Sequence, residues 1–140
     1  MREILYKAKR IDNGEWVYGS YLYTFCEDKN CPIVGVQGEK HWIVEENGNI
    51  FWIDEDTVCQ YTGRVDKNGQ KIWENDILVA QLDSKFPEDE TYEQVIWHES
   101  GFCTMEKNST DCEPLDGFDT RYFAVCGNVF DNAELLERKE

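Results

Sequence analysis

The chain has 140 residues, 41% hydrophobic and 14% aromatic, which suits one domain or two small subdomains with buried cores and excludes a disordered chain. It carries 14 basic and 29 acidic residues, a formal net charge of -15 at pH 7. This charge repels phosphate backbones, so it argues against direct nucleic-acid binding and favours either simple solubility or contact with a basic protein partner.

The N-terminal part of the chain is predicted to form short strands. Residues 4–9 alternate in polarity, and Asn13-Gly14 marks a turn before a run of aromatic and aliphatic residues over 15–25. Gly19-Ser20 inside that run indicates a bulge or a bend. After a polar loop, residues 33–36 predict another short strand.

Two Asn-Gly pairs predict hairpins. Asn47-Gly48 lies between the apolar segments 41–44 and 50–53, and Asn68-Gly69 lies between two segments rich in aromatic and β-branched residues. Such a pair is the strongest short-range hairpin signal, because both central residues of the tight turn take positive φ.

Residues 60–78 contain the second of these hairpins and are the most informative stretch of the chain. After the hairpin come Glu74-Asn75-Asp76 and the apolar run 77–80. This order predicts a polar turn that starts a further strand.

The C-terminal part of the chain is also predicted to be mostly strand. Residues 92–97 and 102–106 predict a hairpin that turns at Ser100-Gly101. Residues 107–120 are polar and predict a mobile loop. Residues 122–125 predict a short strand.

One helix is predicted, at the C-terminus. Gly127-Asn128 is expected to turn the chain, and the helix is expected over residues 131–138. Asp131 is positioned to cap it, Glu134 follows three residues later as in a capping box, and Leu135-Leu136 would anchor it. The expected class is therefore all-β with one short C-terminal helix.

The six cysteines are expected to be free thiols in a bacterial cytoplasm. The N-terminus lacks the apolar segment and small-residue cleavage site of a signal peptide, and no apolar run approaches the roughly 20 residues that span a bilayer. We therefore expect a reducing compartment, no membrane association and no disulfides. The cysteines are Cys26, Cys31, Cys59, Cys103, Cys112 and Cys126.

Several motifs along the chain resemble those of one protein family. They are residues 1–4 with 6–8, residues 14–19, residues 60–63 with 66–69 and 72–77, residues 95–97 with 101–102, and residues 127–136. Together they resemble the YopX-like family of bacteriophage and prophage proteins, nearly from end to end.

The resemblance implies a fold but no activity. It implies an N-terminal β subdomain over 1–58 packed on an SH3-like small barrel with the terminal helix over 59–140, or one YopX-like domain over 1–137. The boundary is expected between residues 55 and 60. The family has no defined function, so the resemblance implies no catalytic, cofactor-binding or metal-binding residue.

Two positions depart from the family pattern. Asn75 stands where the family usually has glycine, and a position that needs positive φ tolerates Asn second best after Gly. Ala133 stands where the family usually has proline, which removes a pre-set first helical turn without preventing the helix. Neither change is expected to alter the fold.

The cysteines and histidines give only a weak metal signal. Cys26 and Cys31 are separated by four residues, but no second closely spaced pair is present, and His41 and His98 stand alone in the sequence. Structural zinc sites usually combine two tight pairs. Incidental thiols are therefore the preferred interpretation, and Cys26 with Cys31 and a distant partner is the residual zinc candidate.

Other catalytic patterns are equally weak. A cysteine beside His98 would need a local activating feature, and none is present. The runs Asp54-Glu55-Asp56 and Glu88-Asp89-Glu90 are typical of solvated loops, and neither follows the ligand spacing of a calcium-binding loop. No phosphate-binding glycine loop is present.

The five tryptophans all lie in predicted strands, where core packing is the default and some can serve as anchors for a partner. They are Trp16, Trp42, Trp52, Trp73 and Trp97. Short open strands leave unpaired backbone groups, which favours self-association into a homo-oligomer.

Three functional hypotheses follow. The first is a non-enzymatic interaction protein of phage or prophage origin that self-associates. The second is an acidic mimic of nucleic acid that inhibits a basic partner. The third is a metal-dependent enzyme, which requires a pocket where titratable groups converge.

Overall fold

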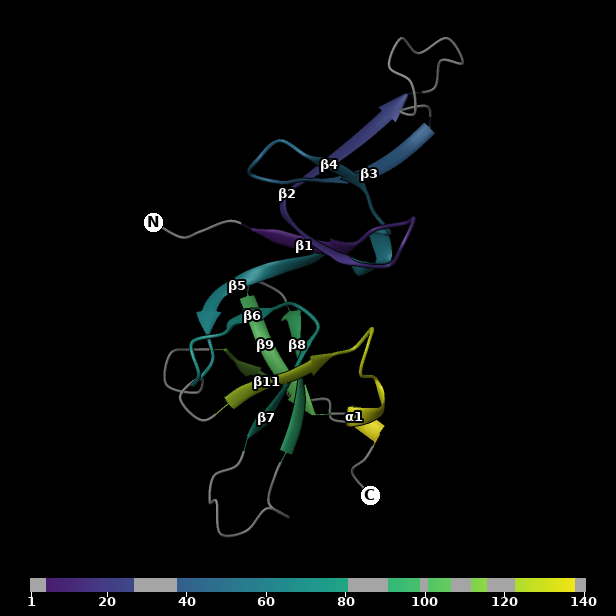
Figure 1. Ribbon diagram of the computed structural model, residues 1–140. Coiled ribbons are helices and arrows are strands. Elements are labelled where there is room, and N and C mark those ends of the chain that lie inside the picture. The colour runs from purple at the N-terminus through teal and green to yellow at the C-terminus, as the bar shows by residue number, and fades with distance from the viewer. Residues whose placement is uncertain are drawn as a thin grey trace. The chain divides into compact units, whose positions relative to one another are not determined.

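The computed structural model describes residues 5–26, 38–80, 91–98, 101–106, 112–115 and 123–137. The described chain is mostly β, with two antiparallel sheets and one short helix, so the predicted class is confirmed (Figure 1). The chain divides into two compact units, residues 1–60 and 61–140.

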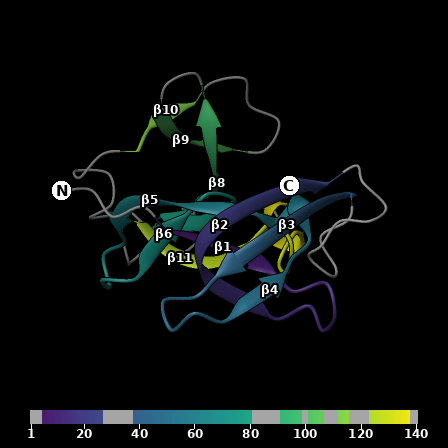
Figure 2. The same cartoon turned by 90° about the horizontal axis from the view of Figure 1, so that it is seen from above.

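The first unit is built from antiparallel strands in the order β4-β3-β2-β1-β5. Its elements are β1 (Tyr6–Lys9), β2 (Trp16–Cys26), β3 (Gly38–Val44), β4 (Ile50–Trp52), the 3-10 turn η1 (Glu55–Thr57) and the start of β5 (Cys59–Val65). Strands β2, β3 and β4 lie side by side in Figure 2. The predicted strand at residues 33–36 lies outside the described residues.

Strand β2 changes its partner at Gly19-Ser20. Residues 16–19 pair with β1, and the pairing with β3 begins at Ser20. A Cβ atom on Gly19 would collide with the carbonyl oxygen of Val44, so only glycine allows this close approach. The predicted bend at this position is the point where the strand passes from one partner to the next.

The core of the first unit lies on one face of these strands. Its buried centre consists of Ala8, Val17, Ile43 and Ile53, and partly buried Tyr6, Tyr21, Phe51 and Val58 pack around it. Val17 and Ile43 are at odd-numbered positions of β2 and β3, so the even-numbered side chains between them project from the opposite face.

Both predicted Asn-Gly hairpins are present, but their turn type differs from the expected one. Gly48 and Gly69 have φ of 93° and 82°, whereas Asn47 and Asn68 do not have positive φ. The N–H groups of the two glycines donate to the carbonyl oxygens of Glu45 and Asp66 at 2.9 and 3.0 Å. These are longer loops in which a single positive-φ residue closes the turn.

The second unit contains the last part of β5 and the whole of β6 (Lys71–Trp73). It also contains an open sheet with the strand order β10-β9-β8-β7-β11. The strands of the open sheet are β7 (Asp76–Ala80), β8 (Thr91–His98), β9 (Gly101–Glu106), β10 (Glu113–Pro114) and β11 (Phe123–Asn128). Its core contains Ile72, Leu78, Val95 and Leu115. The described strands do not close into a barrel, so the SH3-like barrel is not confirmed.

The hairpin predicted at Ser100-Gly101 is supported by the pairing of β8 with β9, which runs to His98 opposite Gly101. The loop predicted over 107–120 is only partly described. Within it, Glu113 and Pro114 form β10 against Thr104 and Cys103, so this part of the prediction is wrong. The strand forms because Leu115 reaches the core beside it.

The C-terminal predictions need two corrections. The turn expected at Gly127-Asn128 is wrong, because β11 runs through Asn128 after a register shift between Val125 and Gly127. The helix α1 (Glu134–Glu137) starts three residues later than predicted. The reason is that Asn128 Oδ1 accepts hydrogen bonds from the N–H groups of Phe130 and Asp131, which holds this segment in a turn.

Asn75 occupies the turn between β6 and β7 with φ of 70°, as the sequence predicts. Its N–H donates to the carbonyl of Val95 at 2.8 Å, and its carbonyl accepts from Val129 N–H at 3.0 Å. Its side-chain oxygen accepts from Gln94 Nε2 at 3.1 Å. The left-handed residue thus connects the β6–β7 turn to β8 and to the residue that follows β11.

We predict that Asn75→Ala lowers the free energy of unfolding by about 1–2 kcal/mol. Alanine is sterically disfavoured at positive φ, and it cannot accept the hydrogen bond from Gln94. Asn75→Gly should stay within about 1 kcal/mol of the wild type, since glycine adopts positive φ freely. Urea denaturation followed by tryptophan fluorescence measures both. Equal stability of the alanine variant and the wild type would show that this position is not strained.

Asp66 fastens the second hairpin to β11. Its side chain is 4% exposed. Oδ1 accepts from the N–H groups of Asn68 and Gln70 at 2.8 and 2.9 Å, and Oδ2 accepts from Val125 N–H at 2.9 Å. One carboxylate therefore satisfies three backbone donors, two in the turn and one on a strand 59 residues away.

We predict that Asp66→Asn destabilises the protein by about 1–3 kcal/mol, because the amide group must place an N–H donor against a backbone N–H donor. Asp56→Asn removes the same charge at an exposed position and is the control. The measurement is the shift in the urea midpoint of each variant. If both variants shift equally, the loss reflects net charge and the three hydrogen bonds contribute nothing.

Candidate functional site

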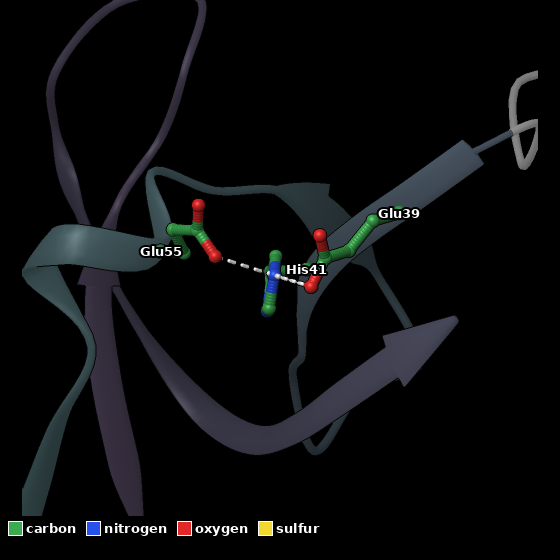
Figure 3. A group of neighbouring side chains, drawn as sticks. All are labelled: Glu39, His41 and Glu55. Carbon is green, nitrogen blue, oxygen red and sulfur yellow. Dashed lines mark ion pairs between the residues drawn. The ribbon is translucent and has the colours of Figure 1, made fainter. Parts of the chain in front are cut away.

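A group of titratable side chains meets beside the first half of β3. Glu39 and His41 lie on β3, and Glu55 lies on η1 (Figure 3). Glu55 Oε2 is 2.7 Å from His41 Nε2, and Glu39 Oε1 is 3.7 Å from the same nitrogen. Among the described residues, this is the one group of three or more whose potential ligand atoms all lie within 4.8 Å of one another.

The local fold explains why these three residues meet. Glu39 and His41 are two positions apart on one strand and so project from the same face. The N–H of Ile53 donates to the carbonyl of His41 at 3.0 Å, which places the start of η1 beside β3. Asp54 caps η1 by accepting from Asp56 N–H at 3.0 Å, and this leaves Glu55 directed at the histidine.

The imidazole of His41 lies between two tyrosines. It stacks on the ring of Tyr21 at 5.8 Å between centroids and meets the ring of Tyr23 at 5.1 Å. The hydroxyl of Tyr21 forms a short hydrogen bond with Nδ1. The His41 side chain is 14% exposed, so two aromatic rings and one hydrogen bond fix the plane of the imidazole.

The other ring nitrogen has carboxylates close by but no aligned bond. Nε2 is buried, and no described residue forms a hydrogen bond with it, although Glu55 Oε2 lies within 2.7 Å. Figure 3 shows the ring nearly edge-on, with the carboxylates of Glu39 and Glu55 on opposite sides of it. The carboxylates approach from outside the plane in which an imidazole N–H or lone pair points.

Burial and the two carboxylates also affect the tyrosines. Partial burial raises the pKa of Tyr21 above its usual value of 10.0, and the negative charges of Glu55 and Glu39 raise it further. Burial and Glu39 raise the pKa of Tyr23 in the same direction. The site therefore disfavours additional negative charge.

Several candidate site residues named from the sequence are not part of this group, and some lie outside the described residues. Cys31 and the run Glu88-Asp89-Glu90 lie outside the described residues, and so do the side chains of Cys26 and His98. The four cysteines with described side chains form no disulfide, and they are Cys59, Cys103, Cys112 and Cys126. In the run 54–56, Glu55 is directed at His41, whereas Asp54 serves as a cap.

The expectation that His41 stands alone is therefore wrong in space, although right along the sequence. The missed signal was modest. Glu39 and His41 alternate on one strand, and the hairpin predicted at Asn47-Gly48 brings residues 50–53 back beside 41–44. The acidic run that follows the hairpin must then emerge near His41.

The tryptophans divide between core and surface. Trp73 is buried at 6% exposure, whereas Trp52 and Trp97 are 45% and 49% exposed. Trp97 packs edge-on against Phe102 at 4.8 Å. Trp42 donates from Nε1 to Thr24 Oγ1 at 2.8 Å. Core packing thus explains one of these tryptophans and leaves two largely on the surface.

Trp42 and Trp52 belong to a surface that we call the outer face of β2–β4. It comprises three cross-strand rows that project away from the core of the first unit, namely Ser20 with Val44 and Ile50, Leu22 with Trp42 and Trp52, and Thr24 with Lys40. Its most exposed apolar members are Ile50 at 57%, Trp52 at 45% and Leu22 at 42%. Lys40 Nζ lies over the Trp52 ring, 4.1 Å from its centroid.

A shallow hollow of about 470 Å³ lies beside the β3–β4 turn. It is lined by Tyr18, Glu45, Glu46 and Asn47. The ring of His41 does not line this hollow, and none of the described cysteine thiols does. The group around His41 is thus separate from this hollow. Within the described ranges, no helix is long and apolar enough to cross a membrane.

The fold and the site define a small antiparallel β protein of two units with a group of titratable side chains beside one strand. The YopX protein family matches residues 5–137, and this chain belongs to that family. The crystal structure of protein EF1440 from Enterococcus faecalis is similar at a TM-score of 0.58 and 19% identity, over 97% of this chain and 99% of that chain. At this identity the likeness shows a shared fold alone. A comparison with curated proteins finds no match to this chain.

We predict that Glu55→Gln lowers the pKa of Tyr21, because removing a nearby negative charge makes the phenolate easier to form. The measurement is a pH titration of the metal-free protein by NMR of ring-labelled tyrosine. The raised pKa of Tyr21 in the folded state contributes stability that is complete below about pH 10 and is lost as the pH rises through the folded value.

Glu46→Gln is the control, since Glu46 is not among the groups that raise the pKa of Tyr21. It should leave the Tyr21 titration unchanged. An unchanged titration in the Glu55→Gln variant would contradict the placement of Glu55 beside this site.

Proposed function

We propose that this YopX-family protein is a non-enzymatic interaction module of phage or prophage origin, working in the bacterial cytoplasm, and that it self-associates through the outer face of β2–β4. The resemblance of the motifs at residues 60–78 to those of a family of bacteriophage and prophage proteins supports the phage origin. The exposed aromatic and aliphatic side chains of the outer face support the interaction role.

The single observation that carries the proposal is the composition of the outer face. Leu22, Trp52 and Ile50 are each more than two-fifths exposed, and Trp42 and Val44 lie between them on β3. Contiguous apolar surface of this kind is uncommon on isolated proteins and marks interaction surfaces. Tryptophan at the centre of such a patch is typical of residues that dominate binding energy.

The charge of this face favours a second copy of the chain as the partner. The formal net charge is -15, yet the three rows of the outer face contain no acidic residue and one lysine. A basic partner would be attracted to the acidic surfaces instead. Two copies that join their outer faces bury apolar surface and keep their carboxylates in water.

A second candidate, an acidic mimic that inhibits a basic nucleic-acid-binding protein, is favoured by the net charge alone. The two candidates differ in their response to salt. Salt screens the repulsion between two acidic chains and so strengthens apolar self-association, whereas it weakens binding of an acidic protein to a basic partner.

We predict that sedimentation equilibrium under reducing conditions shows a reversible dimer of the 16.5 kDa chain whose dissociation constant falls as salt is raised. Trp52→Gln should weaken the dimer by at least about tenfold, since an interface tryptophan that dominates binding contributes about 2 kcal/mol or more. Reducing conditions are needed because Cys126 is an exposed cysteine outside any disulfide, and its oxidation could link two chains.

Trp97→Gln is the matched control, because Trp97 is equally exposed but lies in the second unit. It should leave the dissociation constant unchanged. A clean monomer at every concentration and salt would overturn self-association, and equal weakening by the two tryptophan variants would remove the outer face as its location.

A further inference from the structure

We propose that Glu39, His41 and Glu55 form a binding site for one divalent transition-metal ion, with His41 Nε2 and one oxygen from each carboxylate as ligands. The inference concerns a different face of β3 from the outer face, and it does not depend on self-association. It rests on the donor types, their distances, the fixed imidazole and the charge of the group.

The donor types select a class of ion. One imidazole nitrogen with two carboxylate oxygens is a ligand set that suits zinc, cobalt, manganese or iron. Calcium and magnesium prefer all-oxygen sites with more ligands, so the histidine disfavours them. The protein supplies three ligands here, and water would complete the coordination.

The distances are close to those that coordination requires. Two ligands at about 2.0–2.1 Å from a tetrahedral zinc ion are about 3.3 Å apart. The observed separations from His41 Nε2 are 2.7 Å to Glu55 and 3.7 Å to Glu39, on either side of that value. Both glutamates are more than half exposed, so their side chains can make this adjustment at the surface.

The histidine is already oriented by a second partner. The Tyr21 hydroxyl engages Nδ1, and stacking on Tyr21 holds the ring plane. When this hydroxyl accepts from Nδ1–H, Nε2 carries the free lone pair in the ring plane. The two exposed carboxylates would turn toward that plane to share an ion with it. Metal-binding histidines are commonly oriented in this way by a partner on the other ring nitrogen.

The charge of the group gives a reason for a cation to bind. Two carboxylates lie close to one buried nitrogen that has no aligned hydrogen-bond partner among the described residues. A divalent ion at this point would neutralise both carboxylates and would satisfy the nitrogen. A proton on His41, forming an imidazolium between the two glutamates, is the competing occupant.

The primary test is NMR of the reduced protein with substoichiometric Mn²⁺, which broadens amide signals near the bound ion. The expected result is selective broadening at residues 39–41 and 55. Glu55→Gln should abolish this pattern, and Asp56→Asn, which removes a neighbouring exposed carboxylate, should preserve it. Broadening centred on the acidic run at residues 88–90, or none at residues 39–41, would overturn the proposal.

Affinity provides a second readout. Co²⁺ binding followed by visible absorption should show d–d bands without the charge-transfer band of thiolate ligands, which excludes the free cysteines as the site. Glu39→Gln and Glu55→Gln should each weaken Co²⁺ binding by about tenfold or more, since even supporting residues of metal sites commonly contribute that much. Equal affinity in these variants and in Asp56→Asn would assign the group as an ion pair only.

Discussion

The second unit depends on the satisfaction of backbone N–H groups where its short strands end. Asp66 is the clearest case, because its buried carboxylate accepts three of them and joins the hairpin turn to β11. The carboxylate of Asp76 likewise accepts a hydrogen bond from a backbone donor, Trp73 N–H, at 2.8 Å. An unsatisfied buried donor costs about 1–3 kcal/mol, so these short polar side chains are as necessary as the apolar core.

This constraint separates the architecture of the protein from its proposed interactions. The motif-rich block at residues 60–78 holds Asp66, Asn75 and Asp76, and the contacts described for these side chains go to backbone and neighbouring strands. The residues of β3 contribute instead to the core and to both proposed sites. Ile43 of β3 enters the core, Glu39 and His41 form the charged group, and Trp42 lies on the outer face.

The sequence predicts local features well and distant contacts poorly. Both hairpins, the turn at Asn75 and its positive φ follow from residues within a few positions of one another. The contact of Asp66 with Val125 spans 59 residues, and no local pattern encodes it. Glu55 and His41 meet because β4 returns beside β3, which the hairpin at Asn47-Gly48 indicates only indirectly. The predicted start of the helix was wrong for a different reason, because Asn128 holds the preceding segment in a turn.

Two copies of this protein are proposed to meet at the outer face of β2–β4. A dilution series of amide NMR spectra in reducing buffer at high salt tests it residue by residue. Self-association through this face predicts concentration-dependent shifts at residues 20–24, 40–44 and 50–52, with the second unit unaffected. Shifts centred on Trp97 and Phe102 of the second unit, or spectra that do not change with concentration, would contradict it.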